Sequence, residues 1–151
     1  MYSRSETLRA IGRLMARMAQ ETAQTLEADG AIEAAPLLKP WTAGSMTAPV
    51  NYAANDVRTE AGQPWRCVQA HAHHGEEGWN PAASRALWSP YHATRQTHAL
   101  PYVAPSCASD AYNAGEWMVW TDGLAYQALR DAVDRGPDEL PDAWKAGEEM
   151  A

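Results

Sequence analysis

The sequence repeats itself at a spacing of about sixty residues. The aromatic and turn residues of segment 110–144 recur, in the same order, in segment 51–88. The matched positions are Tyr52 and Tyr112, Asn55-Asp56 and Gly115-Glu116, Gly62 and Gly123, Trp65 and Tyr126, Gln69 and Arg130, Pro81 and Pro137, and Trp88 and Trp144. A chain of 151 residues with this repeat has room for two very small units and an appendage, and each unit will have a thin core.

Composition excludes several classes of function. The net charge of -7 and the scattered Lys and Arg residues argue against nucleic acid as a partner. No apolar run is long enough to cross a bilayer, and the N-terminus lacks the apolar core of a signal peptide, so we expect a soluble protein that is not exported by that route. Cys67 and Cys107 lie in different units, so we expect a buried thiol and a loop thiol without a disulfide.

Residues 3–29 are expected to form one helix, because Ser3 and Glu6 fit a capping box and Gly30 follows as a stop. Side chains with the spacing of a coiled-coil seam lie at Leu8, Ile11, Met15, Met18, Thr22 and Thr25. The alternative is a helix packed on its own domain through a stripe widened by Leu14, Ala19, Ala23 and Leu26. We favour weak self-association, assume a homotrimer, and expect the oligomer to need additional contacts.

The expected fold is mainly β with this N-terminal α-helix. Composition divides the chain into six segments: an oligomerisation or anchoring helix (1–30), a linker that becomes extended (31–49), a first three-stranded antiparallel β module (50–91), an irregular connector (92–109), a second such module (110–145) and a tail (146–151). The expected strands are 56–59, 65–70 and a closing strand at 87–88 in the first module, and 116–120 and 125–129 in the second. Three prolines and one glycine predict that the linker contains no helix.

The motifs YNAGE and WTDGLAY, followed by a proline and a closing tryptophan, resemble the small chitin-type carbohydrate-binding module. The first copy, with WRCVQAHAHHGEEGWNPAASRALW, is similar to the variant of that module found in tail and baseplate proteins of bacteriophages. The resemblance covers about two thirds of the chain. It implies compact three-stranded antiparallel modules, no catalysis, and exposed rings that stack on sugar faces.

Ligand-binding residues are predicted in both copies. Trp79 is the best-placed candidate, because it lies in a Gly-rich loop before Asn80 and Pro81, and an indole face packs well against the C–H patch of a pyranose while an amide bonds the hydroxyls. The second copy has Arg135-Gly136-Pro137 where that tryptophan is expected. Trp117 and Trp120 lie on opposite faces of one expected strand, so one of them is a candidate contact there. The other matched aromatics are expected in the cores.

Metal and enzyme hypotheses are less well supported by the sequence. His71 and His73 would face one side of a strand and are the weak candidates for a metal site, but a solvated loop is favoured because no further ligand follows at a suitable spacing. Adjacent acids such as Glu76 and Glu77 do not face each other across a cleft, and no phosphate loop or nucleophile motif is present. We therefore predict no metal, no cofactor and no enzymatic activity.

These observations favour a structural protein of a phage virion, made in the host cytoplasm and assembled with other tail or baseplate proteins. In this hypothesis the helix oligomerises or inserts into the tail, and the modules are displayed for attachment to a host-surface glycan. The alternative is a purely architectural connector or decoration subunit whose aromatics are covered by neighbouring subunits. A weaker third interpretation is a domain of a bacterial cell-wall or chitin-processing system.

Overall fold

The structure, a computed structural model, describes residues 1–148. The chain begins with helix α1 (Arg4–Thr22), the 3-10 turn η1 (Ala23–Thr25), helix α2 (Ala28–Ala34) and the turn η2 (Ala35–Leu37). The first group of strands is β1 (Val50–Tyr52), β2 (Val57–Glu60), β3 (Gln63–Cys67), β4 (His71–His73) and β5 (Trp88–Pro90). These strands are followed by the turn η3 (Gln96–His98), β6 (Leu100–Pro101), the turn η4 (Ala108–Asp110), β7 (Trp117–Val119), β8 (Ala125–Ala128), the turn η5 (Pro141–Ala143) and β9 (Trp144–Ala146). The predicted order of an N-terminal helix followed by small antiparallel sheets is confirmed.

Helix α1 begins as the sequence predicts. The backbone N–H of Glu6 donates to the Ser3 hydroxyl at 3.1 Å, and the backbone N–H of Ser3 donates to the Glu6 carboxylate at 2.7 Å. This capping box satisfies two N–H groups that have no partner within the helix. No helix of residues 1–148 is long and apolar enough to cross a membrane.

The predicted end of this helix is wrong. The hydroxyl of Thr22 donates back to the Met18 carbonyl oxygen and that of Thr25 to the Thr22 carbonyl oxygen, and such bonds compete with the helical ladder. The chain is extended at Leu26, and α2 then runs through Gly30, against which the Leu26 side chain packs. The expectation that the linker from residue 31 contains no helix is therefore also wrong, because α2 extends to Ala34.

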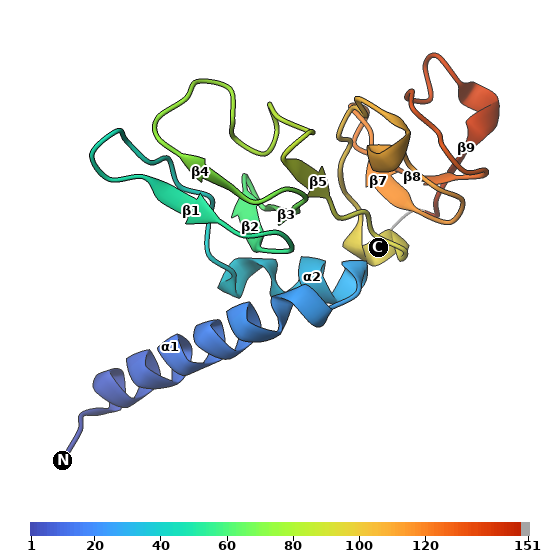
Figure 1. Cartoon of the computed structure of the whole chain (residues 1–151). Coiled ribbons are helices and arrows are strands. Elements are labelled where there is room, and N and C mark those ends of the chain that lie inside the picture. The colour runs from blue at the N-terminus through green and yellow to red at the C-terminus, as the bar shows by residue number, and fades with distance from the viewer. Residues whose placement is uncertain (149–151) are drawn as a thin grey trace.

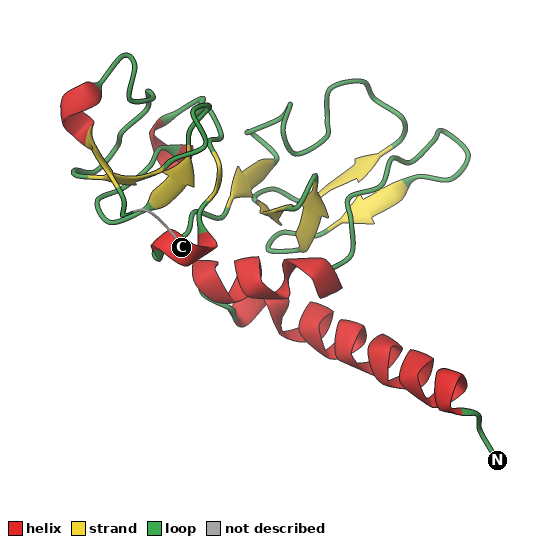
Figure 2. Cartoon of the chain, turned by 180° about the vertical axis from the view of Figure 1, so that it is seen from behind, coloured by secondary structure: helices red, strands yellow, loops and turns green. Residues whose placement is uncertain are grey.

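The break in the helix places small side chains against the strands. Ala23 and Ala31 are fully buried, and Ala23 forms a core cluster with Leu38 and Val57. The amide of Gln20 joins the same contact, since it donates to the Val57 carbonyl oxygen at 3.0 Å. The earlier turns of α1 have no buried residue, and this part of the helix extends away from the strands (Figure 1, Figure 2).

The first β unit, residues 39–91, contains two small sheets. Strands β2, β3 and β5 are antiparallel in that order, and β1 pairs with β4. Ala61 and Gly62 both have positive φ, which suits the tight turn between β2 and β3. Trp65 and Cys67 are buried and Arg66 is exposed, as their alternation predicts, but β3 ends at Cys67 and not at residue 70.

The second β unit, residues 100–147, is a four-stranded sheet in the order β6-β7-β8-β9, with β6 parallel to β7. Its backbone hydrogen bonds repeat those of the first unit. The matched bonds, donor first, are Cys67 to Asp56 and Ala128 to Glu116, Val68 to Leu87 and Leu129 to Ala143, and Trp41 to Thr59 and Tyr102 to Val119. The last pair shows that each unit begins upstream of the expected boundary. Pro40 pairs with Thr59 at the edge of the first sheet, and Pro101 pairs with Val119 at the edge of the second. Proline fits at both positions because an edge residue does not need its N–H for the sheet.

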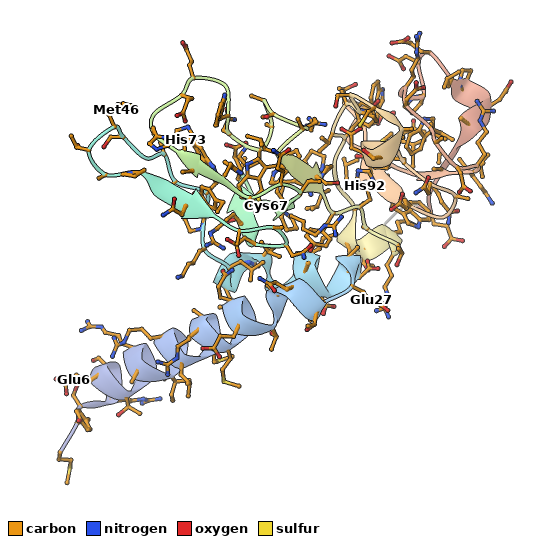
Figure 3. All side chains as sticks on the ribbon, in the orientation of Figure 1. Glu6, Glu27, Met46, Cys67, His73 and His92 are labelled. Carbon is orange, nitrogen blue, oxygen red and sulfur yellow. The ribbon has the colours of Figure 1, made fainter. Side chains whose placement is uncertain are left out.

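The two units and α2 pack on one another. The His92 ring stacks on Tyr112 with ring centres 3.8 Å apart, and Val103 packs against the core cluster of the first unit. His98 lies between two carboxylates of α2, 2.9 Å from Asp29 and 3.0 Å from Glu33. Figure 3 shows His92 between the two groups of strands. The expected irregular connector 92–109 is thus part of the packed body.

Candidate functional site

The loop 74–87 between β4 and β5, called here the Trp79 loop, carries the most exposed tryptophan. Trp79 is 38% exposed, whereas the other six tryptophans, all within the described residues, are buried or half-buried. Its ring centre lies 6.3 Å from that of His71. The loop lies on the side of the strands away from the helices (Figure 1).

Asn80 is held within the loop by Glu60 of β2. Its amide donates to one carboxylate oxygen at 3.1 Å, and the backbone N–H of Ala82 donates to the other at 2.9 Å. The carbonyl oxygen of Asn80 accepts from the N–H groups of Ala83 and Ser84, each at 3.0 Å. The side-chain N–H groups of Asn80 thus anchor the loop, and its predicted contact with sugar hydroxyls stays a prediction.

His73 is a buried anchor at the start of the same loop. Its Nδ1 accepts from the N–H of Gly44 at 2.9 Å, and its Nε2 is 2.9 Å from the carbonyl oxygen of Glu76. This arrangement requires the proton on Nε2. His71 places its Nδ1 2.8 Å from the Gln69 carbonyl oxygen. Both nitrogens of His73 are thus committed, and residues 1–148 contain no group of three His, Cys, Asp or Glu residues that could hold a metal.

Arg85 joins the loop to the second β unit, a role that the sequence analysis missed. Its guanidinium donates to Asp110 at 3.0 Å and to the Ala104 carbonyl oxygen at 2.8 Å. The same group lies over the Trp65 ring, 5.0 Å from the ring centre. A lone arginine in the apolar run before Leu87 and Trp88 was the only sequence signal for this contact.

Asp110, the partner of Arg85, is buried and ionised. Burial acts to raise its pKa, but the backbone N–H groups of Ser106 and Cys107 and the Arg85 guanidinium outweigh it and lower the pKa overall. Two of these bonds, from the N–H of Cys107 at 2.9 Å and from Arg85 at 3.0 Å, are charge-assisted.

The stability that Asp110 contributes is expected to fall with pH. Because its folded pKa lies below the unfolded one, the contribution is complete above the ordinary aspartate pKa and is lost as pH falls through the folded value. Between about pH 7 and about pH 3, the unfolding free energy of the wild type should fall by up to about 1 kcal/mol more than that of Asp110→Asn, because an unfolded aspartate binds its proton only near about pH 3.9 and each pH unit below that removes at most about 1.4 kcal/mol. Urea denaturation of both proteins measures this, and equal losses would contradict it.

The second unit lacks an exposed ring at the corresponding place. The bonds from Ala83 and Ser84 to Asn80 correspond to bonds from Glu139 and Leu140 to Gly136. Trp79 therefore corresponds to Arg135, which pairs with Glu139 at 3.0 Å on the surface. The backbone carbonyl oxygen of Arg135 accepts from the indole N–H of Trp144 at 2.8 Å.

Trp120 holds a loop in place, as Glu60 does in the first unit, and does not present an open ring face. It corresponds to Glu60, and its ring lies so close to Gly136 that a Cβ there would come within 2.2 Å of it. Glu60 and Asn80 in the first unit are thus replaced by a tryptophan packed on a glycine in the second. The Tyr102 ring packs edge-on against Trp120 with ring centres 5.0 Å apart.

Trp117 is also covered in part. Its backbone N–H donates to the Ala93 carbonyl oxygen at 2.8 Å, and a Cβ on Gly147 would lie 2.8 Å from its ring. Both Trp117 and Trp120 are half-buried, so the expected division into one buried and one free ring does not hold. The structure separates these two residues from Trp79, which lies in the other unit.

Comparison with known proteins gives a likeness to solved structures over part of the chain only. The sequence matches no protein-family model and no curated protein. A solved structure of a family GH18 chitinase from Chromobacterium violaceum is similar to part of the chain, with 27% identity, a TM-score of 0.30, and coverage of 42% of this chain and 17% of the chitinase chain. A TM-score this low establishes neither a shared fold nor a shared activity.

Proposed function

We propose that the protein is a non-enzymatic structural component of a bacteriophage tail or baseplate that binds host-surface glycan through its first β unit. The observation that carries the proposal is Trp79, an exposed indole on a loop anchored at Asn80 and Ala82 by Glu60. The motif resemblance to phage-type carbohydrate-binding modules supports the same use. In this proposal the second unit, with Arg135 in the corresponding place, supports the first and does not bind sugar.

A glycan array followed by polysaccharide pull-down tests the sugar claim. Trp79→Ala is expected to weaken binding about tenfold, or ~1.4 kcal/mol, because the stacking face is lost. Because Trp79 is 38% exposed and therefore partly covered, the thermal unfolding midpoint should fall somewhat, and binding is compared at a temperature where both proteins are folded. Arg135→Ala, at the corresponding position of the second unit, is the matched control and should bind like the wild type. An absence of binding by the wild type, or equal binding by Trp79→Ala, would rule out the proposal.

We infer that α1 associates with α1 of two further copies as a parallel coiled coil. The seam residues Leu8, Ile11, Met15 and Met18 are all exposed, whereas Ala19 and Ala23 face the first β unit. In this register Arg9, Arg13 and Arg17 lie on the outer face of the bundle and do not oppose one another across the seam. The free stripe therefore fits other copies of the same helix.

The mass of the full chain in solution tests this association. The wild type is expected to be a trimer and Ile11→Asn with Met15→Asn a monomer, because two buried seam positions become polar. Arg13→Ala changes the outer face only and should remain a trimer. Light scattering across a dilution series distinguishes the states. A monomeric wild type at every concentration would refute the coiled coil.

The alternative function is a purely architectural connector or decoration subunit of a virion, without glycan binding. The exposure of Trp79 supports it equally, since a neighbouring subunit could cover the ring. In that case assembly should reduce quenching of indole fluorescence by a polar quencher. Quenching that is the same in the free chain and in the particle would argue for a ring left open to glycan.

A further inference from the structure

Arg85 connects the Trp79 loop to the other β unit through a buried set of contacts. Its side chain is 13% exposed and that of its partner Asp110 is 3% exposed, so the ion pair is largely shielded from solvent. The guanidinium also donates to the carbonyl oxygens of Ala104 and, at 3.4 Å, of Ala82. One side chain thus contacts its own loop, the second unit and the Trp65 ring.

The chain between Trp79 and Arg85 is a continuous run of hydrogen-bonded turns. The carbonyl oxygen of Asn80 accepts from Ala83 and Ser84, and Pro81 between them is fully buried. The carbonyl oxygen of Ser84 then accepts from the N–H of Trp88 at 3.0 Å. Arg85 and Trp79 are therefore joined by a short segment whose residues 80–84 are closed by their own hydrogen bonds.

The corresponding loop of the second unit has neither residue. Arg135 stands where the first unit has Trp79, and Pro141 stands where it has Arg85. Within this chain, the exposed Trp79 and the arginine that pairs with Asp110 therefore occur together on one loop, and both are missing from the corresponding loop of the second unit. This joint occurrence separates Arg85 from the framework residues that both units share.

We propose that Arg85 is a positioning residue, through which Asp110 of the second β unit holds the Trp79 loop in the conformation that presents the indole. The second unit then acts as a support for the binding loop of the first. What Trp79 binds rests on the function proposed above, but the positioning of its ring does not.

Fluorine NMR of the full chain labelled with 5-fluorotryptophan tests the positioning directly. The protein has seven tryptophans, and Trp79→Phe identifies the resonance of Trp79. Arg85→Ala and Asp110→Asn are each expected to shift or broaden that resonance while those of Trp120 and Trp144 stay in place. Arg85→Lys should restore it only in part, because lysine keeps the charge but lacks the planar fork. Arg135→Ala, on the corresponding loop, should leave it unchanged.

A change confined to Trp65, which touches Arg85, with Trp79 unchanged in both variants, would overturn the proposal. The Trp144 resonance reports whether each variant remains folded. If Arg85→Ala unfolds, Asp110→Asn still decides the question, because it leaves the loop sequence intact, and Arg85→Lys provides the same test if both unfold. An unchanged Trp79 resonance in the remaining folded variant then counts against the proposal.

Glycan binding supplies a second, separable readout. If the wild type binds polysaccharide, Arg85→Ala should weaken binding several-fold although the Trp79 side chain itself is unchanged. If the wild type binds no glycan, the proposed function fails, while the fluorine spectra still decide whether Arg85 positions Trp79. Loss of binding in Trp79→Ala with full binding in Arg85→Ala would support the function and refute the positioning.

Discussion

Replacing Trp88 with alanine is expected to lower the free energy of unfolding by about 3–5 kcal/mol. The Trp88 side chain is fully buried, and its ring packs edge-on against Tyr52 and His71 with ring centres 5.0 and 5.7 Å away. In a unit with so thin a core this is a large part of the total stability, which for a domain is about 5–15 kcal/mol. Urea denaturation followed by near-ultraviolet circular dichroism measures the loss.

Trp144 of the second unit provides the matched comparison. Its indole N–H donates to the Arg135 carbonyl oxygen at 2.8 Å, whereas the indole N–H of Trp88 has no hydrogen-bond partner among residues 1–148. Trp144→Phe should therefore cost about 1 kcal/mol for the lost hydrogen bond in addition to the change in packing, and Trp88→Phe should not. A loss below about 1 kcal/mol for Trp88→Ala would show that this ring does not organise the core.

Gly44→Ala is expected to destabilise the first unit by about 1–3 kcal/mol or more, because the added methyl has no space. A Cβ at Gly44 would lie 2.0 Å from the His73 carbonyl oxygen and 2.6 Å from the Val50 nitrogen. Both are backbone atoms of paired residues in β4 and β1, so neither can move without disturbing that sheet. The loss should appear in urea denaturation and as faster amide exchange in β1 and β4.

Gly12→Ala serves as the control for this substitution. Gly12 lies in α1 with no atom within 4 Å of a Cβ, so alanine there should stabilise the helix by up to about 1 kcal/mol. If Gly44→Ala proved as harmless as Gly12→Ala, the close approach of the two segments at His73 would be refuted.

Local signals in the sequence predicted the start of the first helix and the two hairpins, but not α2 or the strands β1, β4, β6 and β9, so the expected three-stranded modules are wrong. The capping box at Ser3 located the start of α1, and turn residues such as Gly62 located the hairpins. The break after Thr22 could not be predicted in this way. It depends on burial of Ala23 and Ala31 beneath neighbouring strands, and alanine carries no local mark that distinguishes a buried contact from an exposed helix position.

The repeat spacing was visible in the sequence, but the extent of each unit was not. The aromatic framework shows the match from Tyr52 onward, whereas the upstream segments share only the short run Pro40-Trp41-Thr42-Ala43 and Pro101-Tyr102-Val103-Ala104. Their equivalence lies in backbone bonds to β2 and β7, which side-chain identity does not encode.

The candidate site was predictable only in its exposed part. Trp79 stands out because an indole in a Gly-rich loop has no strand neighbours to cover it. The roles of Asn80 and Trp120 depend on partners distant in sequence, Glu60 and Gly136, and become clear only when the two units are compared. Arg85 depends on Asp110 of the other unit in the same way.

In the proposed function, the first β unit binds glycan through Trp79 and the second does not. Titration of the 5-fluorotryptophan-labelled chain with soluble N-acetylglucosamine oligomers, and with any glycan selected on the array, tests it most directly. We expect saturable movement of the Trp79 resonance while those of Trp117 and Trp120 stay fixed. Movement of Trp117 or Trp120 without Trp79, or no movement with any of these glycans, would contradict the account.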